Sequence, residues 1–199
     1  MNYFLGVDLA AVEKRPTGIC IMTERLACMT WTVHPDQAIV ETAAYYRPRA
    51  VALDAPLSRP LKGGFRRCDR ELRDVGVNVL PPGLDPMKKL TERGVNLARR
   101  LKLLGLTALE TFPRGVRIFL GIPAWVRDRR ELIERLKHLG LAGIPATASL
   151  HEVDAATCAL MAYLWWIGLA QSYGGGREGV IMMPKPSVRT LLPLRPQVG

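Results

Sequence analysis

Three short apolar segments in the first 110 residues each end at a carboxylate, and this pattern constrains the fold more than any other feature. None of the three alternates between polar and apolar residues, which indicates strands buried on both faces, as in a parallel sheet covered by helices. In such sheets, ligands bind beyond the carboxyl ends of the strands. The acids that lie at these ends are Asp8, Asp54 and Glu110.

The order of the elements predicts an α/β protein with a mixed sheet. Three strands, a helix and a further strand combine an antiparallel meander with a crossover, and crossovers between parallel strands are right-handed. We expect strands at residues 3–8, 17–23, 26–33, 50–54 and 106–110, and an edge strand at 179–183. We expect helices opening at 34–36 and spanning 65–73, 87–104, 127–138 and 150–171.

The length of the chain predicts one domain. A chain of 199 residues, about half of them apolar, can bury one substantial core, which we assign to residues 1–183. Residues 184–199 form a proline-rich, basic tail. No secretory signal is visible, and the apolar stretch 155–170 is too short to span a bilayer comfortably. We therefore expect a cytoplasmic protein that does not bind membranes.

The charge of the chain favours a polyanionic partner. The formal net charge is +10, and nucleic acid is the leading candidate because basic surfaces release counterions from phosphates. A soluble protein that happens to be basic is the simpler alternative. Much of the charge lies in a polar excursion after Asp54, which either grips phosphates or forms ordinary surface ion pairs. Its basic residues are Arg59, Lys62, Arg66, Arg67, Arg70 and Arg73.

The acids themselves suggest a site for a hard divalent metal. Carboxylates gathered at one edge repel one another unless a cation neutralises them. A further acid, Asp154, shares the apolar face of the last helix with Cys158 and Met161, so it needs a partner in the interior. His151 lies one turn earlier and either orients a water, binds metal or is a lone surface histidine. Glu152 completes a capping box with Ser149.

The cysteines give no zinc-binding pattern. Cys20, Cys28, Cys68 and Cys158 show no Cys-x-x-Cys spacing, so reduced, buried thiols are the default. Cys20 and Cys28 flank a predicted hairpin turn, and a disulfide between them stays open.

Several segments resemble the ribonuclease H-like superfamily, which includes Holliday-junction resolvases, and most closely a family of predicted nucleases called domain of unknown function 429. The resemblance is carried by Gly6-Val7-Asp8, Leu53-Asp54-Ala55-Pro56-Leu57, Arg67-Cys68-Asp69-Arg70-Glu71-Leu72-Arg73, Glu110-Thr111-Phe112-Pro113 and Asp154-Ala155. It implies a five-stranded sheet of order 3-2-1-4-5 flanked by helices, with helical insertions. It also implies Mg²⁺ or Mn²⁺ held by Asp8, Asp54 and Asp154, although Glu110 has no resolvase counterpart and the number of metals stays open.

These observations predict a metal-dependent nuclease that uses a two-metal mechanism. Asp8, Asp54, Glu110, His151 and Asp154 are its candidate catalytic residues. The alternatives are a nucleotide-binding relative of the same fold or a non-catalytic nucleic-acid-binding protein. The sequence does not distinguish DNA from RNA, and an exposed edge strand with an apolar last helix would permit a homodimer.

Overall fold

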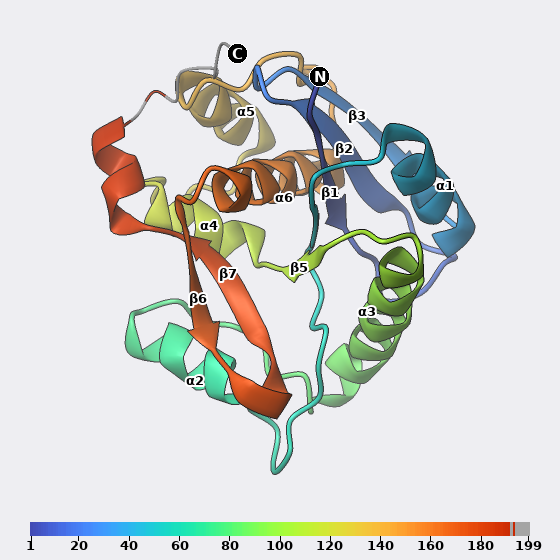
Figure 1. Ribbon diagram of the computed structural model, residues 1–199. Coiled ribbons are helices and arrows are strands. Elements are labelled where there is room, and N and C mark those ends of the chain that lie inside the picture. The colour runs from blue at the N-terminus through green and yellow to red at the C-terminus, as the bar shows by residue number, and fades with distance from the viewer. Residues whose placement is uncertain (192, 194–199) are drawn as a thin grey trace.

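The computed structural model describes residues 1–191 and 193, and its centre is a mixed five-stranded sheet (Figure 1). The strand order is β3-β2-β1-β4-β5, as the resemblance to the ribonuclease H-like superfamily implied. The first three strands form an antiparallel meander, and β4 and β5 run parallel to β1. The strands are β1 (Tyr3–Asp8), β2 (Thr17–Thr23), β3 (Cys28–Val33), β4 (Val51–Leu53) and β5 (Ala108–Glu110).

Helices cover both faces of the sheet and enclose a separate core on each side. The helices are α1 (Asp36–Tyr46), α2 (Arg67–Asp74), α3 (Asp85–Leu103), α4 (Pro113–Phe119), α5 (Arg129–His138) and α6 (Leu150–Trp166). The core on the α6 side contains Phe4 and Ala52, and the core on the α3 side contains Leu5, Val7 and Leu53. Successive strand residues therefore alternate between the two cores, as the pleat requires.

Helix α6 lies directly on the central strands because two glycines face it. A Cβ built on Gly6 of β1 would stand 1.9 Å from the carbonyl oxygen of Ala155, and one on Gly18 of β2 would stand 2.0 Å from that of His151. No side chain other than hydrogen fits at these positions. The close contact brings the amino-terminal half of α6 to the end of β1 at which Asp8 lies.

The carboxyl-terminal part differs from the sequence prediction. The last helix was expected to reach residue 171, but it ends at Trp166, and Gly168 then adopts a φ of 75° that reverses the chain. The chain continues as β6 (Ala170–Gly174), which pairs with β7 (Val180–Pro184) in a separate two-stranded sheet. The predicted edge strand at 179–183 is therefore β7, paired with a strand that the sequence did not predict. A short 3-10 turn, η1 (Gly176–Glu178), joins the two strands.

The first part of the predicted tail packs on the body. Residues Pro186–Leu191 form a 3-10 helix, η2, with Val188 fully buried. Arg189 donates hydrogen bonds of 2.7 Å to the carbonyls of Ile118 and Phe119, at the end of α4. Residues 192 and 194–199 of the predicted tail lie outside the described residues.

Two further sequence expectations concern cysteines and membranes. All four cysteines are free and buried, and Cys20 and Cys28 lie on the neighbouring strands β2 and β3 without a disulfide. Among the residues described, no helix is both long enough and apolar enough to cross a bilayer.

Candidate active site

Asp8 and Asp54 lie side by side at the carboxyl ends of two parallel strands. Val7 of β1 pairs with Leu53 of β4, so the next residue of each strand is an aspartate. The amide of Asp54 donates a 2.9 Å hydrogen bond to the carbonyl of Val7, which fixes the two strand ends together. By the alternation of the pleat, both aspartates follow Gly6 and Ala52 onto the α6 face.

The first turns of α6 bring two further groups to these aspartates. Ser149 and Glu152 form the predicted capping box, which fixes where the helix begins. Nδ1 of His151 lies 2.6 Å from Oδ2 of Asp8, while the imidazole remains half exposed. The negative charge of Asp154, one turn later, contributes to raising the pKa of both Asp54 and His151.

Arg117 is a part of this cluster that the sequence did not reveal. It lies on α4, is buried, and forms an ion pair with Asp154. The same guanidinium lies 3.5 Å from the hydroxyl of Thr157. Nothing in the segment from Pro113 to Pro123 distinguishes Arg117 from Arg114, because only the packing of α4 against α6 turns one inward and the other outward.

The surroundings of the cluster disfavour the charged forms of Asp54 and Asp154. Burial, followed by the charges of Asp8 and Asp154, raises the pKa of Asp54 well above its usual range. Burial also raises the pKa of Asp154, against the opposing effect of Arg117. The hydrogen bond to Asp8 raises the pKa of His151, so the imidazolium is favoured beside that carboxylate. No hydrogen bond or ion pair to the Asp54 carboxylate is found among the described residues.

The three carboxylates are ligands that suit a hard divalent cation, but they are not arranged around a common metal position. Three carboxylates offer only oxygen ligands, which magnesium and manganese prefer. The unpartnered Asp54 carboxylate, destabilised by its neighbours, is the group that a cation would relieve most. In the part of the chain that the structure describes, however, no three acidic, histidine or cysteine side chains are arranged to hold a metal ion. Asp8 faces His151 and Asp154 faces Arg117 instead.

Glu110 ends its strand as predicted, but it belongs to a different group of residues. It pairs in register with Leu53 and not with Asp54, so it is one residue out of phase with the two aspartates. Its Oε2 accepts hydrogen bonds from the amide of Leu57, at 2.7 Å, and from Arg66, at 2.8 Å. Burial raises the pKa of Glu110, and the hydrogen bonds from Arg66 oppose this shift. Glu110 thus holds the loop that follows Asp54.

The prediction that Arg66 binds phosphates is wrong, because its side chain does not lie on the surface. It is almost fully buried, and its guanidinium bonds the carboxylates of Asp69 and Glu110 and the hydroxyl of Ser58. These bonds use all five of its N–H donors. The other predicted basic residues, Arg59, Lys62, Arg67, Arg70 and Arg73, are exposed.

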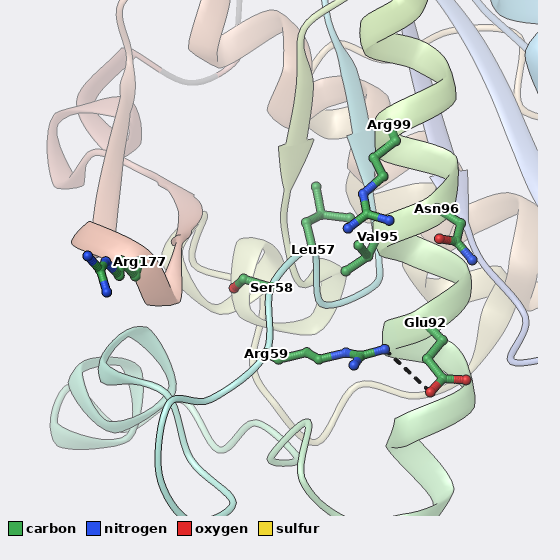
Figure 2. A pocket seen from close by; sticks show the side chains of 8 residues that line it. All are labelled: Leu57, Ser58, Arg59, Glu92, Val95, Asn96, Arg99 and Arg177. Atoms are coloured by element: carbon green, nitrogen blue, oxygen red, sulfur yellow. Dashed lines mark hydrogen bonds and ion pairs between the residues drawn. The ribbon is translucent and has the colours of Figure 1, made fainter.

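A basic depression of about 600 Å³ lies beside the loop that follows β4 (Figure 2). Figure 2 shows Arg59 and Arg99 on the α3 side of this loop and Arg177 across it, on the β6–β7 turn. Arg59 is paired with Glu92 at 3.4 Å. Arg99 and Arg177 were missed because they are distant in sequence from the basic excursion, and only the fold brings them to it.

Comparisons with known proteins agree with this architecture. A family model described as "Protein of unknown function (DUF429)" matches residues 6–178. The structure of Thermus thermophilus RuvC in complex with a Holliday junction substrate superposes with a TM-score of 0.53 at 14% identity, covering 84% of this chain and 97% of that chain. A second structure of Thermus thermophilus RuvC gives a TM-score of 0.49 at 16% identity, with 82% and 95% coverage. No curated protein sequence matches the chain. The sheet order and the first superposition establish the ribonuclease H-like fold.

Proposed function

This chain belongs to the DUF429 family, and we propose that it is a nuclease that hydrolyses phosphodiester bonds of nucleic acid with divalent metal ions. One observation carries the proposal. Asp8 and Asp54 follow paired residues of the parallel strands β1 and β4, and the charge of Asp154 on α6 acts on Asp54. A partly buried site in which Asp8 and Asp154 raise the pKa of Asp54 has a functional use when a cation binds there.

The candidate ligands are the three aspartates. Asp8, Asp54 and Asp154 together would hold the metal ions through their carboxylate oxygens. When bound, Mg²⁺ or Mn²⁺ would stabilise charge on the attacking and leaving oxygens of the phosphodiester. Arg117 would then release Asp154 and turn its guanidinium to a phosphate oxygen, a contact that arginine favours. His151 holds Asp8 in position through its Nδ1 and presents its other nitrogen to solvent.

Nucleic acid is the proposed substrate because the charge of the chain and its basic depression match a phosphate backbone. The net charge of +10 gives long-range attraction, and Arg59, Arg99 and Arg177 would contact successive phosphates. Lys62, Arg67, Arg70 and Arg73, which are exposed on the same loop and on α2, would offer further contacts to phosphates. The RuvC structure solved with a Holliday junction supports a nucleic-acid partner for this fold.

Replacement of Asp8 tests the proposal most directly. Asp8→Asn keeps the size of the side chain and removes its charge, so we expect cleavage of a nucleic-acid panel with Mn²⁺ to be abolished while the circular dichroism spectrum is unchanged. Asp85→Asn, at an exposed ion pair with Lys88 at the start of α3, is the matched control and should cleave normally. Full cleavage by the Asp8→Asn protein would end the nuclease proposal.

A non-catalytic nucleic-acid- or nucleotide-binding protein of the same fold is the second candidate. It is favoured by the internal partners of two acids, since His151 and Arg117 already neutralise much of the charge of Asp8 and Asp154. Titration calorimetry with Mn²⁺ separates the two candidates. Negligible heat of metal binding, together with tight and salt-sensitive DNA binding, would favour the binding protein.

A further inference from the structure

A cavity of about 570 Å³ opens next to Asp54 and is lined by residues other than those of the basic depression. It lies beyond the ends of β4 and β5 and is bounded by the loop before α3, the start of α4 and strand β7. Its walls are mainly apolar and are formed by Val79, Leu80, Met87, Leu90, Phe112 and Ile181. Asn78 and Arg114, both exposed, add polar groups to the lining.

Three of the charged residues that line the cavity, Arg66, Asp69 and Glu110, are buried and bonded to one another. Arg66 has no free donor, because all five N–H groups are engaged. Oε1 of Glu110 accepts one hydrogen bond, from Arg66, and the Asp54 carboxylate accepts none from the described residues, so both can accept a hydrogen bond from a ligand. With Asp54 and the exposed Arg114 added, three carboxylates and two guanidiniums line the cavity, and the excess of carboxylates favours a ligand that carries N–H donors.

We propose that this cavity receives a single nucleobase, unstacked from its strand, while the adjoining phosphodiester lies at the aspartate cluster. The inference rests on the nucleic-acid partner of the proposed function and adds the form in which the strand is bound. A base is flat and apolar on its faces, which suits the walls, and its ring and amino N–H groups match the carboxylate oxygens. The volume falls in the range of small-ligand sites, about 300–1,000 Å³. Asp54 lines the cavity and also belongs to the aspartate cluster, so base and phosphate would be neighbours on one strand.

A cavity that receives an unstacked base would make the protein selective for bases that are easily unstacked. A base in a regular duplex must be unpaired and unstacked before it enters the cavity, whereas a single-stranded or mismatched base is already accessible. Single-stranded and branched substrates should therefore bind more tightly than a perfect duplex.

The test uses a series of short single-stranded DNAs, each with one 2-aminopurine at a different position, bound to the full chain without divalent metal. The emission of 2-aminopurine rises when the base is unstacked, so we expect enhancement at one position. Met87→Trp fills the cavity and should weaken binding about tenfold, the order of one lost base-stacking contact. Leu103→Trp, at the exposed far end of the same helix, is the matched control and should bind normally. Fluorescence anisotropy of labelled DNA gives the affinities, which decide the comparison because tryptophan itself quenches 2-aminopurine.

The outcomes separate this inference from the nuclease proposal. Unchanged affinity of the Met87→Trp protein, or no enhanced position in the series, would overturn the base pocket even if cleavage is observed. If the emission of 2-aminopurine rises at one position but the unmodified protein does not cleave nucleic acid, the base pocket is retained and the nuclease proposal is rejected. Leu80→Trp, on the exposed loop wall, gives the same comparison if Met87→Trp fails to fold.

Discussion

At the scale of single residues, Arg66 is the most consequential charge outside the aspartate cluster. Its neighbour Arg67 pairs with Glu71 in solvent, whereas Arg66 is enclosed with Asp69 and Glu110. The network joins the start of α2 to the end of β5 and, through Leu57 and Ser58, to the loop that follows Asp54. Arg66 thereby helps to determine where that loop lies.

We expect Arg66→Met to lower the free energy of unfolding by about 3–5 kcal/mol, because two carboxylates would remain buried without their partner. Arg70→Met, which removes a largely exposed guanidinium from the same helix, should change it by less than about 0.5 kcal/mol. Urea denaturation followed by circular dichroism measures both values. Equal stability of the two variants would contradict the structural role assigned to Arg66.

The sequence predicts which acids end a strand, but it does not predict the register between strands or the packing of the helices. Asp8 and Asp54 were grouped correctly because consecutive parallel strands end at one edge. Glu110 was grouped with them, but the sequence does not show that β5 is shifted by one residue, so that Glu110 pairs with Leu53. The pairing of Asp154 with Arg117 depends on how α4 packs, which no local pattern records.

At the scale of elements, the contact between α6 and the sheet determines the geometry of the site. Gly6 and Gly18 allow the helix backbone to touch β1 and β2, and the first turns of the helix carry His151 and Asp154. A side chain beneath the helix would lift both residues away from Asp8.

Gly6→Ala should therefore destabilise the protein by about 3 kcal/mol, since the added methyl group would overlap the carbonyl of Ala155. Gly64→Ala is the matched control, because its Cβ would find its nearest neighbour, Pro81, at 3.9 Å. Thermal unfolding by calorimetry compares the two. A Gly6→Ala protein as stable as the Gly64→Ala protein would show that α6 is free to move off the sheet.

The order and type of most elements could be predicted, because buried strands and amphipathic helices leave clear periodic patterns. The carboxyl-terminal hairpin could not. Residues 167–171 continue the apolar composition of α6, and one glycine gives only weak evidence for the end of a helix. Strand β6 shows no alternation that would have identified it, since its residues are neither fully buried nor consistently exposed.

At the scale of the whole molecule, the excess of basic residues predicts binding that weakens steeply with salt. Arg99→Ala, in the basic depression, should reduce the slope of log affinity against log salt concentration by about one, as expected for one lost phosphate contact. Arg25→Ala is the control: it removes the same charge from the turn after β2, at the end of that strand away from Asp8, and should leave the slope unchanged. Anisotropy titrations at several salt concentrations measure both, and identical slopes would remove Arg99 from the interface.

The seating of α6 on β1 has a consequence for the protein while it is being made. Strand β1 leaves the ribosome before the helix that covers it and completes the aspartate cluster, because α6 lies more than a hundred residues later in the chain. Until then, the apolar strip around Phe4 stays open to solvent, a state in which incomplete chains aggregate. A chain that ends before α6 therefore lacks His151 and Asp154, and its first strand stays uncovered until that helix has been made.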